Sequence, residues 1–478
     1  MNKYGLRLLG LLLSTCLMGQ TGLQLTDAPV RLFSSTWQDL HGVLTFPDIS
    51  PHSPKIVSFV RIDGDHHYLY IYDVVQQLLT RVSVAGEYVG AEPSEPPEEE
   101  ALLTYTAELD WRPVLDDQGR QWFAFVSNGA ENNYDIYLGV VGQPTYVRLT
   151  TNEAVESNPR WSPDGKSLAF ISTRTGEGDI YLIEGMDKVI EQPEQTQIEL
   201  KQLTDTPLEE MDLAWNPNPK SYLLAYAARE TFEGRDIGTF QIRVLNLKAK
   251  ENPIYRVTDD PLRHYTRPLW DPIRGNRLIY IGREILPASP AVVYIAELTW
   301  GKDDRLHNVE FEGYQEEVFR NVRPNNSRAI WLPGGKAVLL QENRPEQDYP
   351  IYSIDVDRWL ARKPNAVHYF QELHAGFPGV EEYDVAGDYL FFTAREGEDY
   401  FGYLARIYGP DIDPHEPPHY VLNNPGAGAR WFTSGFFWAG ATVAAGAATF
   451  FILQGGGEPG TGIQALPIGL PPSAPEDP

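Results

Sequence analysis

Short apolar stretches separated by turn residues recur along most of the chain, and the clearest example runs from Ser157 to Gly185. Within it, Pro163-Asp164-Gly165 has the chemistry of a tight turn. Proline fixes φ, aspartate bonds its own backbone, and glycine accepts a positive φ. The predicted strands of this module end at Trp161 and span Ser167–Ile171, Asp179–Ile183 and Ile198–Leu203. The pattern therefore predicts one four-stranded antiparallel module.

The same order of strands and turns repeats. Tryptophans that close the predicted first strands lie 50, 54, 55 and 61 residues apart, at Trp111, Trp161, Trp215, Trp270 and Trp331. Weaker copies begin near Phe46 and Tyr383, and the last strand of the final copy is expected near Tyr420–Leu422. A period of this length is typical of propeller blades, which bury their faces only when stacked in a ring. The sequence predicts an all-β fold, a β-propeller of about seven four-stranded blades over residues 44–425.

The four strands of each module are contiguous in sequence, which predicts a ring that closes without exchanging a strand between its ends. Residues 20–43 form a separate N-terminal segment in this interpretation. Within that segment, Asp27–Trp37 is the one spare stretch that could supply a closing strand instead.

Both ends of the chain carry segments of a different kind. Residues 1–19 have a basic start and a short apolar core, and so predict a secretory signal peptide. Leu13-Ser14-Thr15-Cys16 resembles a bacterial lipobox, which makes Cys16 an alternative lipidation site. Residues 431–453 are uncharged and long enough to cross a membrane as a helix. The Gly/Pro-rich residues 454–478 predict a disordered tail.

Composition narrows the functional classes. The chain has 39 Lys and Arg against 66 Asp and Glu, a formal net charge of −27, which argues against nucleic-acid binding. Its one cysteine, Cys16, lies in the predicted signal segment, so the mature protein has no disulfide and no cysteine-based metal site.

Several residues carry a family resemblance. Trp161-Ser162-Pro163-Asp164-Gly165-Lys166 and Asp179-Ile180-Tyr181-Leu182 resemble the WD40-like Pro-Asp repeat of the TolB-like β-propeller family. The resemblance implies an exported propeller of the periplasm or cell envelope that binds proteins, and it implies six blades as the alternative to seven. The repeat-signature residues, for which we expect a structural role, are Trp111, Asp117, Gly119, Asp135, Trp161, Pro163, Asp164, Gly165, Asp179, Trp215, Trp270 and Trp331.

Tests for chemistry give no catalytic, cofactor or metal residue. We find no Gly-x-Ser-x-Gly nucleophile elbow. His415-Glu-Pro-Pro-His419 matches a zinc-protease string, but its two prolines exclude the helix on which that motif depends. Asp63-Gly-Asp-His-His67 could bind a metal, and we favour a hairpin turn.

Three hypotheses remain. The first is a non-enzymatic scaffold that binds an envelope protein or a glycan and is tethered by residues 431–453. The second is a carbohydrate-active propeller enzyme, such as a polysaccharide lyase or a glycosidase-like protein. The third is a homo-oligomer assembled through small residues of the membrane segment, among them Gly440 and Ala444.

Overall fold

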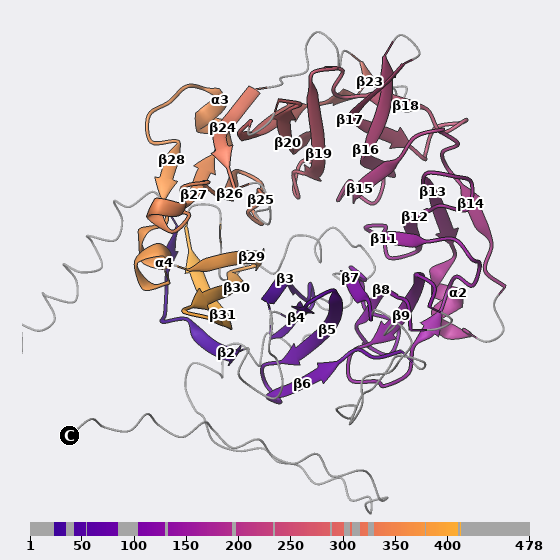
Figure 1. Ribbon diagram of the computed structural model, residues 1–478, viewed down its shortest axis with the longest axis horizontal. Helices are drawn as coiled ribbons and strands as arrows, with labels where there is room; N and C mark the ends of the chain where they lie inside the picture. Colours follow the sequence, from indigo (N-terminus) through magenta and orange to yellow (C-terminus); the bar gives the residue numbers. More distant parts are fainter. Residues whose placement is uncertain are drawn as a thin grey trace, which may run out of the picture.

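Seven antiparallel sheets of four or five strands are arranged in a ring (Figure 1). The computed structural model describes residues 23–34, 43–53, 55–84, 104–129, 132–193, 197–232, 235–286, 289–300, 306–307, 316–323, 329–377, 379–409 and 412. The predicted signal peptide with Cys16, the predicted membrane helix, the predicted tail and the His415–His419 string lie outside these ranges. Inside them, no helix has the length and apolar character that a membrane span requires. The prediction of seven four-stranded blades is confirmed, and the alternative of six is wrong.

The first three blades follow the chain in order. Blade 1 contains β3 (Val43–Ile49), β4 (Ile56–Asp63), β5 (His66–Asp73) and β6 (Leu78–Arg81). Blade 2 contains β7 (Thr106–Trp111), β8 (Trp122–Ser127), β9 (Asp135–Val140) and β10 (Val147–Arg148). Blade 3 contains β11 (Glu156–Trp161), β12 (Ser167–Ser172), β13 (Asp179–Glu184), the helix α2 (Met186–Glu191) and β14 (Leu200–Gln202).

The next three blades keep the same plan with short additions. Blade 4 contains β15 (Glu210–Trp215), β16 (Leu223–Phe232), β17 (Arg235–Asn246) and β18 (Ile254–Arg256). Blade 5 contains β19 (Arg263–Trp270), β20 (Arg277–Glu284), β21 (Ala291–Glu297) and β24 (Glu316–Val322), with a hairpin of β22 (Thr299–Trp300) and β23 (Leu306–His307) before β24. Blade 6 contains β25 (Ile330–Trp331), β26 (Ala337–Gln341), the 3-10 helix η2 (Pro345–Gln347), β27 (Ile351–Asp355), α3 (Val356–Leu360) and β28 (Val367–Tyr369), and α4 (Gln371–Gly376) follows it.

Blade 7 is built from both ends of the described chain. Its inner strands are β29 (Val380–Ala386), β30 (Tyr389–Glu396) and β31 (Asp399–Tyr408). The outer edge of β31 pairs with β1 (Gln24–Leu25) and β2 (Val30–Ser34). The expectation of closure without strand exchange is therefore wrong, and β2 lies in the stretch named as the alternative. Residues 420–422, expected as the last strand, lie outside the described residues, and β1 and β2 hold the edge that they were expected to cover.

The buried side chains of the described residues form seven clusters, one at each joint between neighbouring blades. This follows from the sequence, because both faces of the middle strands are apolar and each face needs a neighbour to cover it. In β8, for example, all six residues from Trp122 to Ser127 are buried. Stability therefore depends on every joint, including the one between blades 7 and 1.

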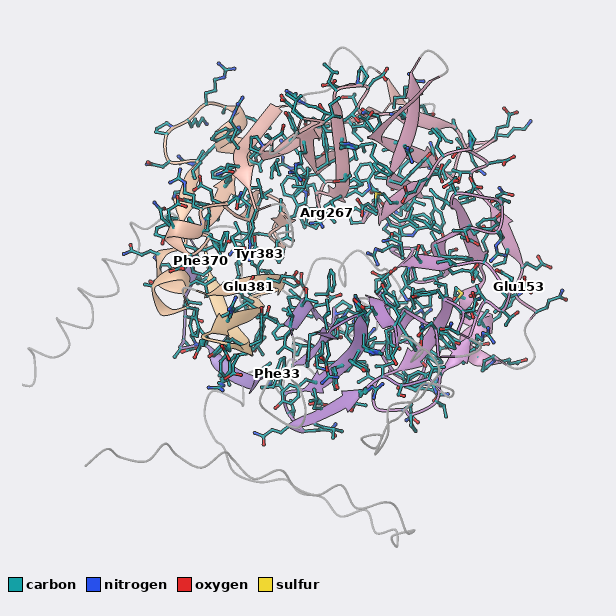
Figure 2. The ribbon with its side chains drawn as sticks, in the orientation of Figure 1. Phe33, Glu153, Arg267, Phe370, Glu381 and Tyr383 are labelled. Carbon is teal, nitrogen blue, oxygen red and sulfur yellow. The ribbon has the colours of Figure 1, made fainter. Side chains whose placement is uncertain are left out.

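Phe33 of β2, labelled in Figure 2, fills the joint between blades 7 and 1. Its ring stacks on Phe59 of blade 1 with centroids 4.2 Å apart, and meets Tyr72 and Phe391 edge-on at 5.7 and 6.1 Å. A Cβ placed on Gly402 would lie 2.2 Å from Phe33 Cζ, so glycine is required where the two strands meet. The N-terminal strand is thus packed into the ring as well as hydrogen-bonded to it.

Candidate functional site

Each signature tryptophan lies at the end of the innermost strand of its blade and packs against the preceding blade; these are Trp111, Trp161, Trp215, Trp270 and Trp331. Three of the indole N–H groups donate to a backbone carbonyl of the preceding blade at 3.0 to 3.2 Å: Trp215 to Arg160, Trp270 to Ala214 and Trp331 to Leu269. In each case the accepting residue comes directly before the preceding blade's own tryptophan. The indoles therefore fill the space between neighbouring blades, and three of them also link the blades by hydrogen bonds.

The Pro163–Gly165 turn of blade 3 is held by both neighbouring blades. From blade 2, Arg112 donates through Nε to the carbonyl of Gly165 at 3.0 Å. From blade 4, the hydroxyl of Tyr222 donates to Asp164 Oδ2 at 2.9 Å. Gly165 has φ 66°, which favours glycine, and the carboxylate of Asp164 accepts from two groups of its own turn. The turn residues therefore fasten three blades.

In blade 2 the carboxylate that organises the corresponding turn is Asp116, whereas the repeat pattern in the sequence indicated its neighbour Asp117. Asp116 accepts the indole N–H of Trp122 at 2.9 Å and Nε of Arg120 at 2.6 Å, as well as two backbone N–H groups. Burial raises the pKa of Asp116, but these hydrogen bonds outweigh it and hold the pKa below its ordinary value. Gly119, with φ 76°, closes the turn.

Asp135, at the start of β9, belongs to a buried polar cluster between blades 2 and 3. It accepts from Arg148 Nη2 at 2.6 Å and from the hydroxyl of Thr150 at 3.0 Å. Burial raises the pKa of Asp135, and the nearby charge of Glu156 adds to the effect. Glu156 in turn accepts from Arg174 at 2.7 Å. Both carboxylate side chains are fully buried, so this pair presents no open surface to a substrate.

Asp179 of β13 stands in the same position one blade further on. It accepts the backbone N–H of Thr206 at 2.9 Å, and the hydroxyl of Thr204 donates to Glu210 at 2.5 Å. Burial raises the pKa of Glu210 to about 7, with a contribution from the charge of Asp179. Paired carboxyl groups recur in glycosidases. Here both members are buried between blades, which gives them a structural role.

The wall of the central channel carries a second set of polar groups. In five innermost strands the register with the next strand shifts at a bulge, where one residue has φ between 50° and 57°: Phe46, Glu108, Asn158, Asp212 and Arg267. A bulge turns the side chain at that position away from the ladder. Figure 2 shows Arg267 beside the channel.

Side chains at and near these bulges accept backbone N–H groups of the next blade. Such a bond is strong when the acceptor is a carboxylate. Glu108 and Asp110 accept from Asn158 and Trp161, Asn158 accepts from Leu213, and Asp212 accepts from Arg267. At the closing joint, Glu382 and Asp384 of blade 7 accept from Phe46 and Ile49 of blade 1. The acidic residues of the channel wall therefore fasten blades to one another.

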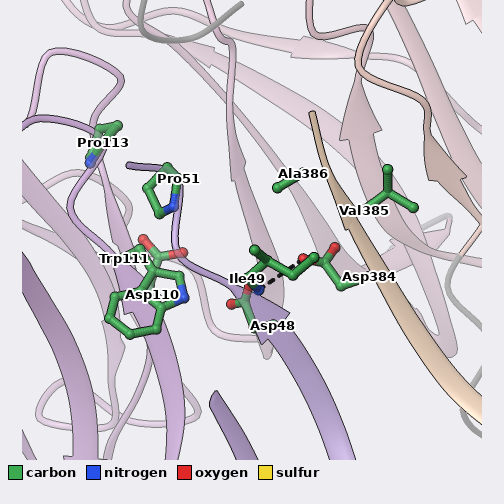
Figure 3. A pocket seen from close by; sticks show the side chains of 9 residues that line it. All are labelled: Asp48, Ile49, Pro51, Asp110, Trp111, Pro113, Asp384, Val385 and Ala386. Carbon is green, nitrogen blue, oxygen red and sulfur yellow. Dashed lines mark hydrogen bonds between the residues drawn. The ribbon is translucent and has the colours of Figure 1, made fainter. Parts of the chain in front are cut away.

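Two of the five bulge residues, Phe46 and Arg267, have no side-chain acceptor, and Phe46 lies at the joint between blades 1 and 2. A pocket of about 280 Å³ opens beside this joint (Figure 3). Blades 1, 2 and 7 each supply three lining residues: Asp48, Ile49, Pro51, Asp110, Trp111, Pro113, Asp384, Val385 and Ala386. Three carboxylates from three blades thus share one pocket with apolar walls.

Negative charge predominates among the residues that line this pocket. No cationic side chain is among its nine lining residues, and Arg160 lies 3.8 Å from Asp110. Asp384 accepts the N–H of Ile49 at 3.1 Å, a bond drawn in Figure 3. Trp111 is 7% exposed, and its indole N–H has no hydrogen-bond partner among the described residues. The pocket therefore offers negative charge and one unused donor.

The described residues contain no cluster of three or more histidine, cysteine, aspartate or glutamate side chains placed to hold a metal ion. Asp63-Gly-Asp-His-His67 spans the hairpin between β4 and β5: Gly64 and Asp65 form the turn, and Asp63 pairs with His66. His66 accepts the backbone N–H of Thr104 at 3.0 Å, and His67 stacks on Tyr105. These histidines contribute to the link between blades 1 and 2.

Comparison with known proteins places the chain among propellers. No family model and no curated protein sequence matches it. TolB from Acinetobacter baumannii is 16% identical with a TM-score of 0.41, over 65% of this chain and 63% of that one, so the match spans less than two thirds of TolB. An oligogalacturonate lyase in complex with manganese is 11% identical with a TM-score of 0.50, over 81% of this chain and 98% of the lyase. The corresponding lyase from Vibrio parahaemolyticus is 11% identical with a TM-score of 0.48, over 81% and 97%. At such identities the likeness extends to the fold, in agreement with the TolB-like repeat in the sequence.

Proposed function

We propose that this chain is a non-enzymatic binding propeller of the cell envelope, which recognises a protein partner at the mouth of its channel. The observation that carries the proposal is the distribution of the polar side chains. The carboxylates of the channel wall and of the buried Asp–Glu pairs are engaged between blades. The pocket shared by blades 1, 2 and 7, lined by residues at the ends of β3, β7 and β29, adds a donor and negative charge. This arrangement suits recognition of a ligand by charge and shape.

The envelope location rests on the sequence of the ends. Residues 1–19 would direct export, Cys16 is the alternative lipidation site, and residues 431–453 would tether the ring to a membrane. A tethered ring keeps its channel mouth near other envelope proteins and raises their effective concentration. Association of two copies through residues 431–453 is compatible with this proposal.

The alternative is a carbohydrate-active enzyme, favoured by the extent of the likeness to oligogalacturonate lyase. Charge opposes it. A galacturonate oligomer is a polyanion, and it would meet a protein of net charge −27 with three carboxylates at the pocket. Like charges of this kind lower association rates and affinity.

The test uses the full-length protein in two experiments. In the first, the chain is immobilised in detergent and exposed to solubilised envelope membranes, with a heat-unfolded sample as the control for non-specific capture. We expect one defined protein to be retained and then to bind the purified chain saturably. In the second, oligogalacturonate is supplied with and without manganese, and no unsaturated product is expected. Turnover, or the absence of any saturable protein ligand, would contradict the proposal.

A further inference from the structure

The pocket of blades 1, 2 and 7 combines two features that point to the same kind of ligand. The first is negative charge, from Asp48, Asp110 and Asp384. The second is the buried indole N–H of Trp111, which has no hydrogen-bond partner in the described part of the chain. Figure 3 draws the indole nitrogen on the side of the ring that faces Asp48 and Ile49. A buried donor without a partner costs free energy, so a ligand that accepts from it gains affinity.

The corresponding indoles elsewhere show what Trp111 lacks. Trp215, Trp270 and Trp331 each donate to a carbonyl of the preceding blade. Trp161, like Trp111, is buried and has no partner for its N–H, but it does not line the pocket. An unpaired indole alone therefore does not mark a site. The coincidence of the indole with the carboxylates and the cavity does.

We infer that this pocket binds an arginine or lysine side chain presented by a partner protein, and that Trp111 donates to a backbone carbonyl of the same segment. The inference rests on the proposed function and names the chemistry of its partner. The carboxylates face the cationic head, and the apolar walls formed by Ile49, Pro51 and Val385 pack against the aliphatic stem. The main-chain carbonyl next to such a residue supplies the acceptor for the indole.

Size and charge favour this occupant over a sugar chain. Pockets for ligands of drug size measure roughly 300–1,000 Å³. The present pocket, at about 280 Å³, accommodates one side chain and is small for an oligosaccharide. Acidic sugars are repelled by three carboxylates. A cationic amino sugar is the remaining glycan, and the experiment includes it.

The experiment measures saturation-transfer NMR on short ligands mixed with the full-length protein. The probes are acetyl-Gly-Arg-Gly amide, acetyl-Gly-Lys-Gly amide, the uncharged citrulline analogue of the arginine peptide, and a glucosamine dimer. We expect both cationic peptides to bind at millimolar concentration, and the citrulline peptide to bind about tenfold more weakly because it lacks the charge-assisted hydrogen bonds. Raising the salt concentration should weaken the cationic peptides and leave the citrulline peptide unaffected.

Matched substitutions locate the site. Asp110→Asn and Asp384→Asn remove pocket charge but keep an oxygen that accepts the backbone N–H of the next blade. Asp212→Asn makes the same change outside the pocket. We expect each pocket variant to weaken the arginine peptide about tenfold, and Asp212→Asn to leave its affinity unchanged. Trp111→Phe should weaken the peptide about fivefold, and Trp161→Phe should not.

The outcomes separate this inference from the proposed function. If neither cationic peptide binds, or if the pocket and control variants behave alike, the inference is overturned, while saturable binding of an envelope protein would still support the proposed function. Tighter binding of the glucosamine dimer would replace the protein partner by a glycan. Self-association that Asp384→Asn abolishes would identify the occupant as a second copy of this chain.

Discussion

Replacing Phe33 by alanine tests how the ring is closed. The ring of Phe33 is 3% exposed and packs on three aromatic rings of blades 1 and 7. Removal of a buried phenylalanine side chain costs about 3–5 kcal/mol. The stacked and edge-on contacts place the expected loss in the upper half of that range. The matched control is Val30→Ala on the same strand, which is 61% exposed and should change stability by less than about 0.5 kcal/mol.

The partner substitution Gly402→Ala makes the test more specific. All three of the closest atoms to the added Cβ belong to Phe33, at 2.2 to 2.8 Å, so the single variant should lose about 1–3 kcal/mol. In the Phe33→Ala background that clash is absent, and the same change should cost less than about 0.5 kcal/mol. Urea unfolding followed by fluorescence measures the four proteins of this cycle. A loss below about 1 kcal/mol for Phe33→Ala, or equal costs of Gly402→Ala in both backgrounds, would refute the closure by β2.

Three further predictions concern the polar groups between blades. The pKa of Glu210 is raised by burial from 4.5 to about 7, so its contribution to stability is full below about pH 4.5 and is lost as the pH rises through 7. The free energy of unfolding of Glu210→Gln, relative to that of the parent, should therefore rise by about 3 kcal/mol between about pH 5 and pH 8 in urea unfolding. Parallel pH profiles of the two proteins would show that the carboxyl does not titrate in this way. Asp212→Ala removes the acceptor of the exposed N–H of Arg267, which water can then satisfy, so it should cost about 0.5–1.5 kcal/mol, against less than about 0.5 kcal/mol for Asp212→Asn. Equal unfolding midpoints for the two variants would argue against a stabilising role of this hydrogen bond between blades 4 and 5. Arg148→Ala leaves the buried carboxylate of Asp135 unpaired and should cost about 3–5 kcal/mol by thermal and urea unfolding, and a loss below about 1 kcal/mol would show that the pair contributes little.

Local pattern was sufficient to predict the blades. The tryptophan spacing and the Pro163–Gly165 turn depend on residues close together in sequence, and the seven sheets follow from them. Closure could not be found in the same way, because β2 pairs with a strand almost the full length of the propeller away. Residues 420–422 match a strand pattern equally well in sequence, and the assignment of β2 to the edge of β31 rests on their pairing and on the packing of Phe33 against Phe59.

The pocket could not be predicted from the sequence, because it forms only when the ring closes. Asp384 and Asp48 are adjacent only because blade 7 meets blade 1, and no spacing in the sequence brings them together. One signal was available: Glu108-Leu-Asp110 recurs as Glu382-Tyr-Asp384, each pair accepting two backbone N–H groups of the following blade. The choice of Asp117 over Asp116 has a similar cause, since adjacent carboxylates are equivalent in sequence and differ in which of them reaches the indole of Trp122.

The most direct test of the binding role is the affinity of the captured envelope protein for three full-length proteins: the parent, the double variant Asp110→Asn/Asp384→Asn, and the control Asp212→Asn. Titration calorimetry at one fixed salt concentration measures all three. If the pocket of blades 1, 2 and 7 binds a basic side chain of the partner, the double variant should lose at least about tenfold in affinity and the control should lose none. Equal affinities of the three proteins would contradict it.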